Sequence, residues 1–309
     1  MTQMRQAAED YLRLRRALGY TLESQGRLLL DFADYAEHNQ AATLTTELAV
    51  AWTIRTRADV NPAHWRHRLG IVRGFARHLI ALDPATEIPP EELMPVHYRR
   101  VAPYLYSPEE IAALIRAAGT FKHPLKALNY TTLIGLLTCT GMRVGETCAL
   151  DRDDVDLGEG VLTIRAGKLG KARQVPLHPT AITALRDYDR QRDLLCPAPS
   201  TAGFFITARG TRLSAQHVPG YFTHIRDAAG IRPAPGGRNP RIHDLRHTFC
   251  ITTLLAWYRA GVDVQARLPQ LSTYLGHVDP ISTYWYLQAT PELMSLAADR
   301  LDDYLGDLS

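Results

Sequence analysis

Apolar residues in the first 82 positions recur with the period of an α-helix. Stripes at steps of three and four run from Ala7 through Tyr11 and Leu14 to Leu18, and again over 28–35. A third helix is expected around 48–52. Asn61-Pro62 is typical of a helix start, with proline at the first helical position. Residues 1–82 are therefore predicted to form an all-helical domain.

A proline-rich stretch without periodicity follows at 83–106, and it is predicted to be a linker. Ser107-Pro108-Glu109-Glu110 then matches a capping box, in which the serine and the second glutamate satisfy each other's backbone N–H groups. A second domain is predicted to begin there and to extend over 107–290. Residues 291–309 are expected to form a helical C-terminal tail.

In the second domain, the spacing of apolar residues changes from a helical period to the alternation of β-strands at one place. A helix is expected over about 124–139, and a short helix starts at Arg143 after Gly141. Residues 161–165 and 173–177 alternate like strands and are joined by a glycine-containing turn, which predicts a hairpin. Residues 204–206 are a candidate short strand. The predicted fold is mainly α: a helical N-terminal domain, then an α+β domain of helices with a small three-stranded antiparallel sheet.

The composition argues against a membrane or secreted protein but does not select a particular function. The 309 residues can bury two cores, and 46% hydrophobic with 22% charged residues is ordinary for a globular protein. No apolar run reaches the roughly 18 residues that a membrane helix needs, and the first residues contain no secretory core. We therefore expect a cytoplasmic protein without a membrane partner. The net charge of +3 is compatible with nucleic-acid binding but does not establish it.

Cysteine and lysine usage adds two small points. The four cysteines lack zinc-finger spacing, so reduced structural thiols are expected. Nearly all basic residues are arginine, which suits bidentate contact with phosphate oxygens as well as a biased base composition. On the helix after Pro62, Arg66, Arg73 and Arg77 share a face with Gly70. That face is either a DNA-backbone contact or a plain solvated surface.

The strongest chemical signal lies near the C-terminus. His243-Asp244-Leu245-Arg246-His247 is followed by Leu275-Gly276-His277, and Tyr286 comes nine positions later. A phenol is a poor nucleophile at neutral pH because its pKa is near ~10. Cations and imidazoles around it favour attack on an anionic group such as a phosphodiester.

Together with Thr140-Gly-Met-Arg143-Val-Gly-Glu146 and the hairpin residue Lys168, these motifs resemble the tyrosine recombinase (phage integrase) family. The family's order is Arg, Lys, His-x-x-Arg, His or Trp, Tyr, and all six positions are filled here. The resemblance covers about 107–290, and the N-terminal helices are more loosely similar to the family's core-binding domain, which clamps DNA. It implies a site-specific DNA recombinase that works through a 3′-phosphotyrosyl intermediate, without metal, ATP or other cofactor.

The resemblance also implies a role for each residue. Arg143 and Arg246 would hold the non-bridging oxygens of the scissile phosphate, with Glu146 anchoring Arg143 from behind. Tyr286 would be the nucleophile. Lys168 would protonate the leaving 5′-oxygen, His243 would assist proton transfer with the nucleophile, and His277 would donate a hydrogen bond to phosphate. The implied partners are double-stranded DNA and three further copies of the chain, in a tetramer assembled on DNA from monomers or weak dimers.

Several residues have rivals. Tyr284 is a second candidate nucleophile and Lys171 a second candidate lysine, but spacing favours Tyr286 and Lys168. Lys171 is then a DNA contact. Arg165 and Arg173 are either strand-surface charges or phosphate contacts, a choice that the sequence leaves open.

Two motifs in the sequence resemble metal sites, but each departs from the pattern that metal binding requires. His243 and His247 at i, i+4 resemble a zinc motif, but Asp244 reaches poorly for a general base and Arg246 would crowd a cation. The acidic run 151–156 resembles a calcium loop, but Val155 stands where an oxygen ligand belongs. A solvated turn before the first strand is the favoured interpretation.

The stretch from Arg246 to His277 exceeds that of compact family members by about two helical turns, and the ending after Thr283 is most similar to integrases of transposons or plasmids. The tail after Thr290 packs either on its own domain or on a neighbouring protomer. The rival functions are a type IB topoisomerase, which shares the chemistry as a monomer, and a non-catalytic DNA-binding accessory protein.

Overall fold

The computed structural model describes residues 3–55, 62–94, 103–165, 172–233, 237–277, 281–288, 292–296 and 298. Lys168 and Lys171 lie outside these residues. The chain divides into two compact units, Met1–Arg100 and Val101–Ser309, which are described separately. Both are built mainly from helices, and among the described residues the sheet lies in the second unit, as the sequence predicts.

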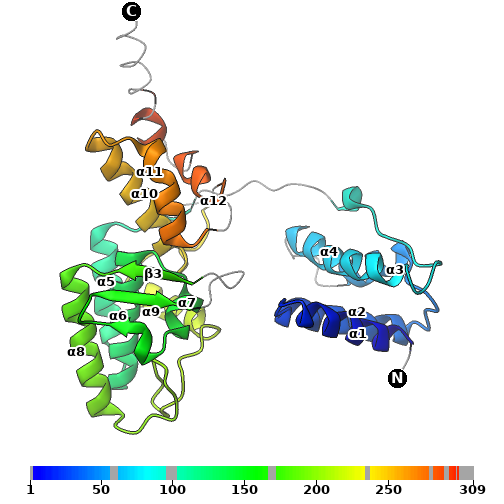
Figure 1. Cartoon of the computed structure of the whole chain (residues 1–309), viewed down its shortest axis with the longest axis horizontal. Helices are drawn as coiled ribbons and strands as arrows, with labels where there is room; N and C mark the ends of the chain where they lie inside the picture. Colours follow the sequence, from blue (N-terminus) through cyan, green and yellow to red (C-terminus); the bar gives the residue numbers. More distant parts are fainter. Residues whose placement is uncertain are drawn as a thin grey trace, which may run out of the picture. The chain divides into compact units, whose positions relative to one another are not determined.

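The helices of the first unit pack against one another (Figure 1). Their buried faces form one apolar core. Phe32 meets Trp52 edge to face at a centroid distance of 5.3 Å, and both rings are fully buried. Its elements are α1 (Gln3–Ala17), α2 (Glu23–His38), α3 (Thr46–Ile54), α4 (Pro62–Leu79) and the 3-10 turn η1 (Glu91–Leu93).

The buried face of α1 differs from the predicted one. Of the predicted stripe, Ala7 and Tyr11 are partly buried against the core, whereas Leu14 and Leu18 are exposed. The buried core residues of α1 are Met4, Ala8 and Leu12. The two stripes are offset by one residue on the same helix. Periodicity alone does not distinguish them, because both recur at steps of three or four.

In the second unit, α6 is contacted by α5, α8 and α10, so it forms the centre of the helical layer (Figure 1). Capping explains where α5 begins: Ser107 and Glu110 form the predicted capping box, with proline in the first turn. The helices are α5 (Pro108–Gly119), α6 (Pro124–Thr140), α7 (Val144–Ala149), α8 (Pro179–Leu195), α9 (Val218–Ala228), α10 (Asp244–Arg259), α11 (Val264–Leu275) and α12 (Ile281–Tyr284), with 3-10 turns η2 (Arg152–Asp154) and η4 (Trp285–Gln288).

The sheet is antiparallel with the order β1 (Val155–Asp156), β2 (Val161–Ile164) and β3 (Arg173–Pro176). The predicted hairpin is confirmed, with Leu162 opposite Val175. The predicted strand at 204–206 is wrong: this segment makes only an isolated bridge from Ile206 to Arg212. The third strand is β1, which lies in the acidic run that the sequence favours as a turn. Two residues of pairing are too short to leave an alternating pattern.

The tail begins on its own unit. Leu293 is fully buried among Cys250, Leu254 and Tyr286, and Glu292 forms an ion pair with Arg259. The first described residues of the tail therefore pack in cis. Within the described residues, no helix combines the length and the apolar character needed to cross a bilayer.

Candidate active site

Arg246 is fixed inside the second unit by backbone carbonyl groups. It lies in the first turn of α10, and only 2% of it is exposed. Its Nη1 donates to the carbonyl of Gly141 at 2.6 Å, and its Nη2 donates to the carbonyl of Leu275 at 2.7 Å. The guanidinium therefore joins the end of α6 to the end of α11.

Arg143 reaches the same place from another helix. It is the N-cap residue of α7, and its guanidinium donates to the carbonyls of Leu275 at 3.4 Å and Gly276 at 3.1 Å. The Leu275 carbonyl thus accepts hydrogen bonds from both Arg143 and Arg246. This carbonyl is at the C-terminus of α11, where the helix dipole favours positive charge.

Two glycines make this convergence sterically possible. Gly141 ends α6 with φ +62°, and a Cβ there would lie 2.5 Å from the Phe249 ring. Gly276 ends α11 with φ +66°, and a Cβ there would lie 2.5 Å from Nη1 of Arg173. Glycine is needed at both positions for the left-handed conformation and for the close approach.

Glu146 is the carboxylate of the cluster. It is buried and accepts from the Arg143 backbone at 3.0 Å and side chain at 2.7 Å, and from Arg173 at 2.7 and 3.1 Å. Burial alone would raise its pKa. The hydrogen bonds from Arg173 and Arg143 outweigh burial and lower the pKa of Glu146 to about 2. Glu146 is therefore ionised and anchors two guanidinium groups.

Tyr286 lies in the same cluster, with 3% of the residue exposed, whereas Tyr284 is 44% exposed. The Tyr286 hydroxyl is 2.9 Å from Nδ1 of His247, and its ring stacks on His277 at a centroid distance of 6.3 Å. Burial raises the pKa of Tyr286, with Cys250 adding to the effect and Arg246 opposing it. The buried phenol is therefore neutral.

The two predicted histidines border this cluster. His277 follows the α11 terminus, and its Nδ1 is 2.7 Å from the Thr283 hydroxyl. Burial, then the guanidinium groups of Arg246 and Arg143, lower the pKa of His277 to about 4. His243 precedes α10 and retains exposed surface, but desolvation of its ring and nearby arginines also lower its pKa to about 4. Both rings are neutral near pH 7.

The structure thus brings together Arg143, Glu146, His243, Arg246, His277 and Tyr286. The predicted DNA contacts are more scattered. On α4, Arg66 is exposed and Arg77 pairs with Glu91 at 3.2 Å. Arg165 is exposed and pairs with Asp154.

Two arginines are placed differently from the DNA contacts that the sequence suggested. Arg73 is 8% exposed and donates to the carbonyls of Pro89 and Pro90, both at 2.6 Å. Arg173 donates to Tyr274 at 2.9 Å and to Glu146. Both guanidinium groups are occupied by the protein interior, so we leave Arg73 and Arg173 out of the proposed DNA surface.

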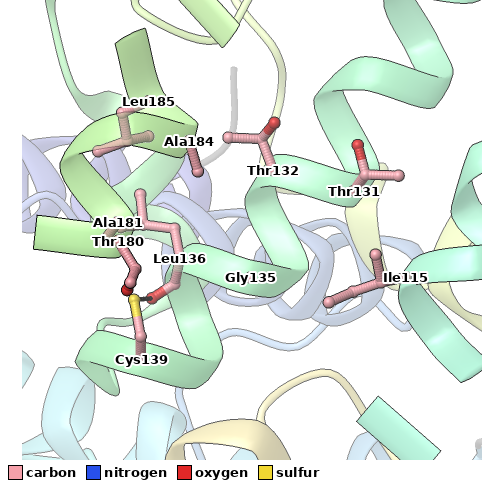
Figure 2. A pocket seen from close by; sticks show the side chains of 10 residues that line it. All are labelled: Ile115, Thr131, Thr132, Gly135, Leu136, Cys139, Thr180, Ala181, Ala184 and Leu185. Atoms are coloured by element: carbon pink, nitrogen blue, oxygen red, sulfur yellow. Dashed lines mark hydrogen bonds between the residues drawn. The ribbon is translucent and has the colours of Figure 1, made fainter. Parts of the chain in front are cut away.

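The hollow drawn in Figure 2 is a different feature. It has a volume of about 380 Å³ and lies between α5, α6 and α8. No charged side chain lines it, and the thiol of Cys139 there is turned to the Leu136 carbonyl at 3.5 Å. This hollow lacks a cation that could hold a phosphate. The arginine–tyrosine cluster is therefore the better candidate site.

The zinc-like and calcium-like motifs form no metal site in the described part of the chain. Among those residues, no group of three or more His, Cys, Asp or Glu side chains is placed to hold a metal ion. In the acidic run, Asp151 and Asp154 are instead paired with Arg212 and Arg165.

Comparison with known proteins identifies the family. Residues 105–292 match the model of the phage integrase family. A putative integrase/recombinase of Sinorhizobium fredii, y4rB, is 42% identical over 98% of both chains. Tyrosine recombinase XerD of Mycobacterium tuberculosis is 34% identical, over 72% of this chain and 66% of its own. The chain belongs to the phage integrase family of tyrosine recombinases.

Solved structures agree on the fold. The Tn1549 transposon integrase in complex with transposon right end DNA superposes with a TM-score of 0.67 at 15% identity, covering 97% of this chain and all of that one. A lambda integrase tetramer bound to a Holliday junction gives 0.62 at 17% identity, covering 91% of this chain and 76% of that one.

Sequence reasoning missed two residues of the cluster. In the sequence, His247 stands out only as half of a zinc-like pair, yet it contacts the Tyr286 hydroxyl. Its position one helical turn after His243 placed it on the same face of α10 and was the available signal. Arg173 carried no such signal, because a strand pattern does not show which helix a long side chain will reach.

Proposed function

We propose that this protein is a site-specific recombinase that cuts and rejoins DNA strands through a 3′-phosphotyrosyl intermediate. The observation that carries the proposal is the convergence of Arg143 and Arg246 on the Leu275 carbonyl, beside Tyr286. Family membership supports the same reaction. The class of substrate is double-stranded DNA.

The two arginines would bind the non-bridging oxygens of the scissile phosphate. Negative charge on these oxygens grows as the pentacoordinate phosphorane forms, so fixed guanidinium groups stabilise the transition state more than the ground state. Carbonyl hydrogen bonds and Glu146 fix both side chains before DNA arrives. Little reorganisation is then required during the reaction.

Tyr286 would supply the nucleophile. Its Oη forms a bond to phosphorus while the bond from phosphorus to the 5′-oxygen breaks, which leaves a phosphotyrosine and a free 5′-hydroxyl. Lys168 would protonate the leaving oxygen, His243 would take the proton of the Tyr286 hydroxyl, and His277 would donate a hydrogen bond to the phosphate. Rejoining reverses these steps with a 5′-hydroxyl from the partner duplex. No metal or nucleotide enters this scheme.

DNA binding must also change the site, because only 3% of Tyr286 is exposed. We propose that the reaction takes place in a tetramer that holds two duplexes, and that assembly on DNA exposes the phenol. The lambda integrase tetramer bound to a Holliday junction, which has a similar fold, supports this arrangement. Residues 1–82 would clamp the DNA, with Arg66 and Arg77 on the backbone, joined by 83–106 to the catalytic domain 107–290. Arg165 and Lys171 would add contacts there.

Similarity to a transposon integrase and to putative integrases favours a mobile element as the source of the DNA. Because the proposed substrate is DNA, we propose a cytoplasmic location. The tail 291–309 begins in cis at Leu293. We propose that its remainder links neighbouring protomers.

Covalent selection from random DNA tests the proposal and finds the target site in the same experiment. The protein is incubated with random-sequence duplexes that carry a nick, washed in denaturant, and the retained DNA is sequenced. Wild type should retain one recurring sequence, Tyr286→Phe should retain none, and Tyr284→Phe should behave as wild type. No adduct with wild type, or an adduct with Tyr286→Phe, contradicts the proposal.

The selected site also separates recombination from relaxation. Two plasmids that carry it should yield recombinants, and cross-linking should capture tetramers on the DNA. Supercoil relaxation by a monomer without recombinants would instead identify a type IB topoisomerase activity. Specific binding without an adduct would indicate an accessory protein.

A further inference from the structure

His247 lies in contact with the reacting atom of the proposed nucleophile. It is half-buried on α10, one turn after His243, and its Nδ1 is 2.9 Å from the Tyr286 hydroxyl. Its ring also meets Trp285 at 5.7 Å and His243 at 5.0 Å between centroids. His247 is not one of the six residues that the family resemblance assigns to catalysis.

We propose that His247 accepts the proton of the Tyr286 hydroxyl when the phenol attacks phosphorus. This proposal rests on the proposed function and adds a catalytic residue to it. It also moves the nucleophile's proton from His243 to His247, because the imidazole nitrogen in hydrogen-bond contact with the Tyr286 hydroxyl belongs to His247. His243, which is more exposed, is left to contact the phosphate.

The protonation states agree with this direction of transfer. Burial, then repulsion from His243 in its protonated form and from Arg241 and Arg238, lowers the pKa of His247 to about 3, so its ring is neutral near pH 7. The buried phenol is neutral as well. A neutral phenol donates and a neutral imidazole accepts, so the bond is written from Oη–H to Nδ1, with the ring proton on Nε2.

The charged groups around His247 explain why it becomes basic only with substrate. Arg238 and Arg241 come from the segment before α10, and Arg246 from α10 itself. From the 281–288 segment it faces the Tyr286 hydroxyl and the Trp285 ring. A phosphodiester anion bound to the arginines would offset these cations and raise the affinity of His247 for a proton.

The step balances. The bond from Oη to phosphorus forms, the bond from phosphorus to the 5′-oxygen breaks, and the Oη proton moves to Nδ1 of His247. The leaving oxygen takes a separate proton from Lys168. During rejoining His247 returns its proton to the departing Tyr286 oxygen, so the enzyme emerges unchanged.

His247→Asn is the sharpest variant, because the Asn Oδ1 occupies about the place of Nδ1 and keeps a hydrogen-bond acceptor that is far less basic. His224→Gln, an exposed histidine on α9, is the matched control. Adduct formation is measured in a single turnover on the selected duplex, with oxygen or with sulfur bridging phosphorus and the 5′-carbon. A thiolate leaves without protonation, so the sulfur substrate bypasses only the leaving-group acid.

On the oxygen substrate, His247→Asn should slow adduct formation by about 10²–10⁴-fold, the usual contribution of a positioned acid or base. The sulfur substrate should restore the rate of adduct formation in Lys168→Ala but not in His247→Asn. His224→Gln should form the adduct at the wild-type rate on both substrates. A wild-type rate for His247→Asn overturns the proposal, because a positioning role alone would survive this change. Rescue of His247→Asn by sulfur also overturns it, since the proton would then belong to the leaving group.

Failure of this proposal is distinguishable from failure of the proposed function. If wild type forms no adduct, the proposed function is wrong; if wild type forms it and His247→Asn is equally fast, only the role of His247 is wrong. DNA binding and thermal unfolding of His247→Asn are compared with wild type. If His247→Asn does not fold, adduct formation by His247→Gln is measured on both substrates and judged by the same rates.

Discussion

Replacing Glu146 by glutamine should loosen the phosphate-binding arginines and destabilise the second unit. The substitution preserves shape but removes the only carboxylate that contacts Arg143 and Arg173 among the described residues. Arg173 would then remain buried, with a side chain only 10% exposed, beside a neutral amide. Removing one partner of a buried ion pair is costly, because it leaves the other charge without compensation.

The lowered pKa of Glu146 gives the size of the effect. A pKa held at about 2 instead of 4.5 corresponds to roughly 3 kcal/mol, since each tenfold change in proton affinity is worth about 1.4 kcal/mol. This agrees with the roughly 3–5 kcal/mol typical of a broken buried pair. In a unit of about 200 residues it should lower the melting temperature by roughly 6–12 °C.

The lowered pKa of Glu146 determines how its contribution to stability changes with pH. The stabilisation by Glu146 is complete above its unfolded pKa near 4.5 and is lost as pH falls towards 2, because the unfolded state then binds the proton more readily. The difference in unfolding free energy between wild type and Glu146→Gln should therefore shrink between pH 5 and pH 2. Exposed Glu159→Gln is the control.

Denaturant unfolding at several pH values measures this difference, and the covalent adduct assay measures the effect on Arg143. Loss of a fixed donor to the transition state typically costs about 10²–10³ in rate, so a similar loss is expected for Glu146→Gln. Equal stability of the two proteins at pH 7, or a stability difference independent of pH, would show that the Glu146 carboxylate does not compensate these arginines.

Two other predictions concern backbone and surface. Gly141→Ala should cost about 1–3 kcal/mol more than Gly261→Ala by thermal unfolding, because both have positive φ but only the Gly141 Cβ would meet Phe249; equal losses would contradict this. Arg66→Ala should lower the slope of log affinity against log salt by about one without altering stability. Arg73→Ala should cost about 1–3 kcal/mol, because it leaves the carbonyl of buried Pro89 without its hydrogen bond. The reverse pattern would place Arg73 on the DNA.

The sequence was sufficient for the class of fold and for six residues of the cluster, but not for His247 or Arg173, because the class of fold and those six residues rest on local patterns. Helix starts such as Ser107 and Arg143 follow from capping chemistry within four residues. The hairpin follows from strand alternation on either side of a glycine-containing turn. Ordered motifs predicted that Arg246 and Tyr286 belong to one site, although nothing in their spacing measures a distance.

Contacts made by long side chains across elements were not predictable. Arg73 looked like a surface residue, because its helical position lies beside Arg66 and Arg77, yet the chain after α4 returns to bury it. Arg173 reaches α7 and α11 from a strand. Such contacts depend on the placement of segments distant in sequence, which periodicity does not encode.

The charge of the assembled cluster follows from these unpredicted contacts. Arg143, Arg173 and Arg246 contribute three positive charges, Glu146 contributes one negative charge, and the neighbouring histidines are neutral in the free protein. Two positive charges therefore remain before Lys168 is counted. A phosphodiester carries one negative charge and its phosphorane carries two, so the cluster matches the transition state better than the bound substrate. Arg246 is held by carbonyl groups instead of a carboxylate. Were a second carboxylate to hold it, one of these two charges would be lost and the match would shift to the ground state.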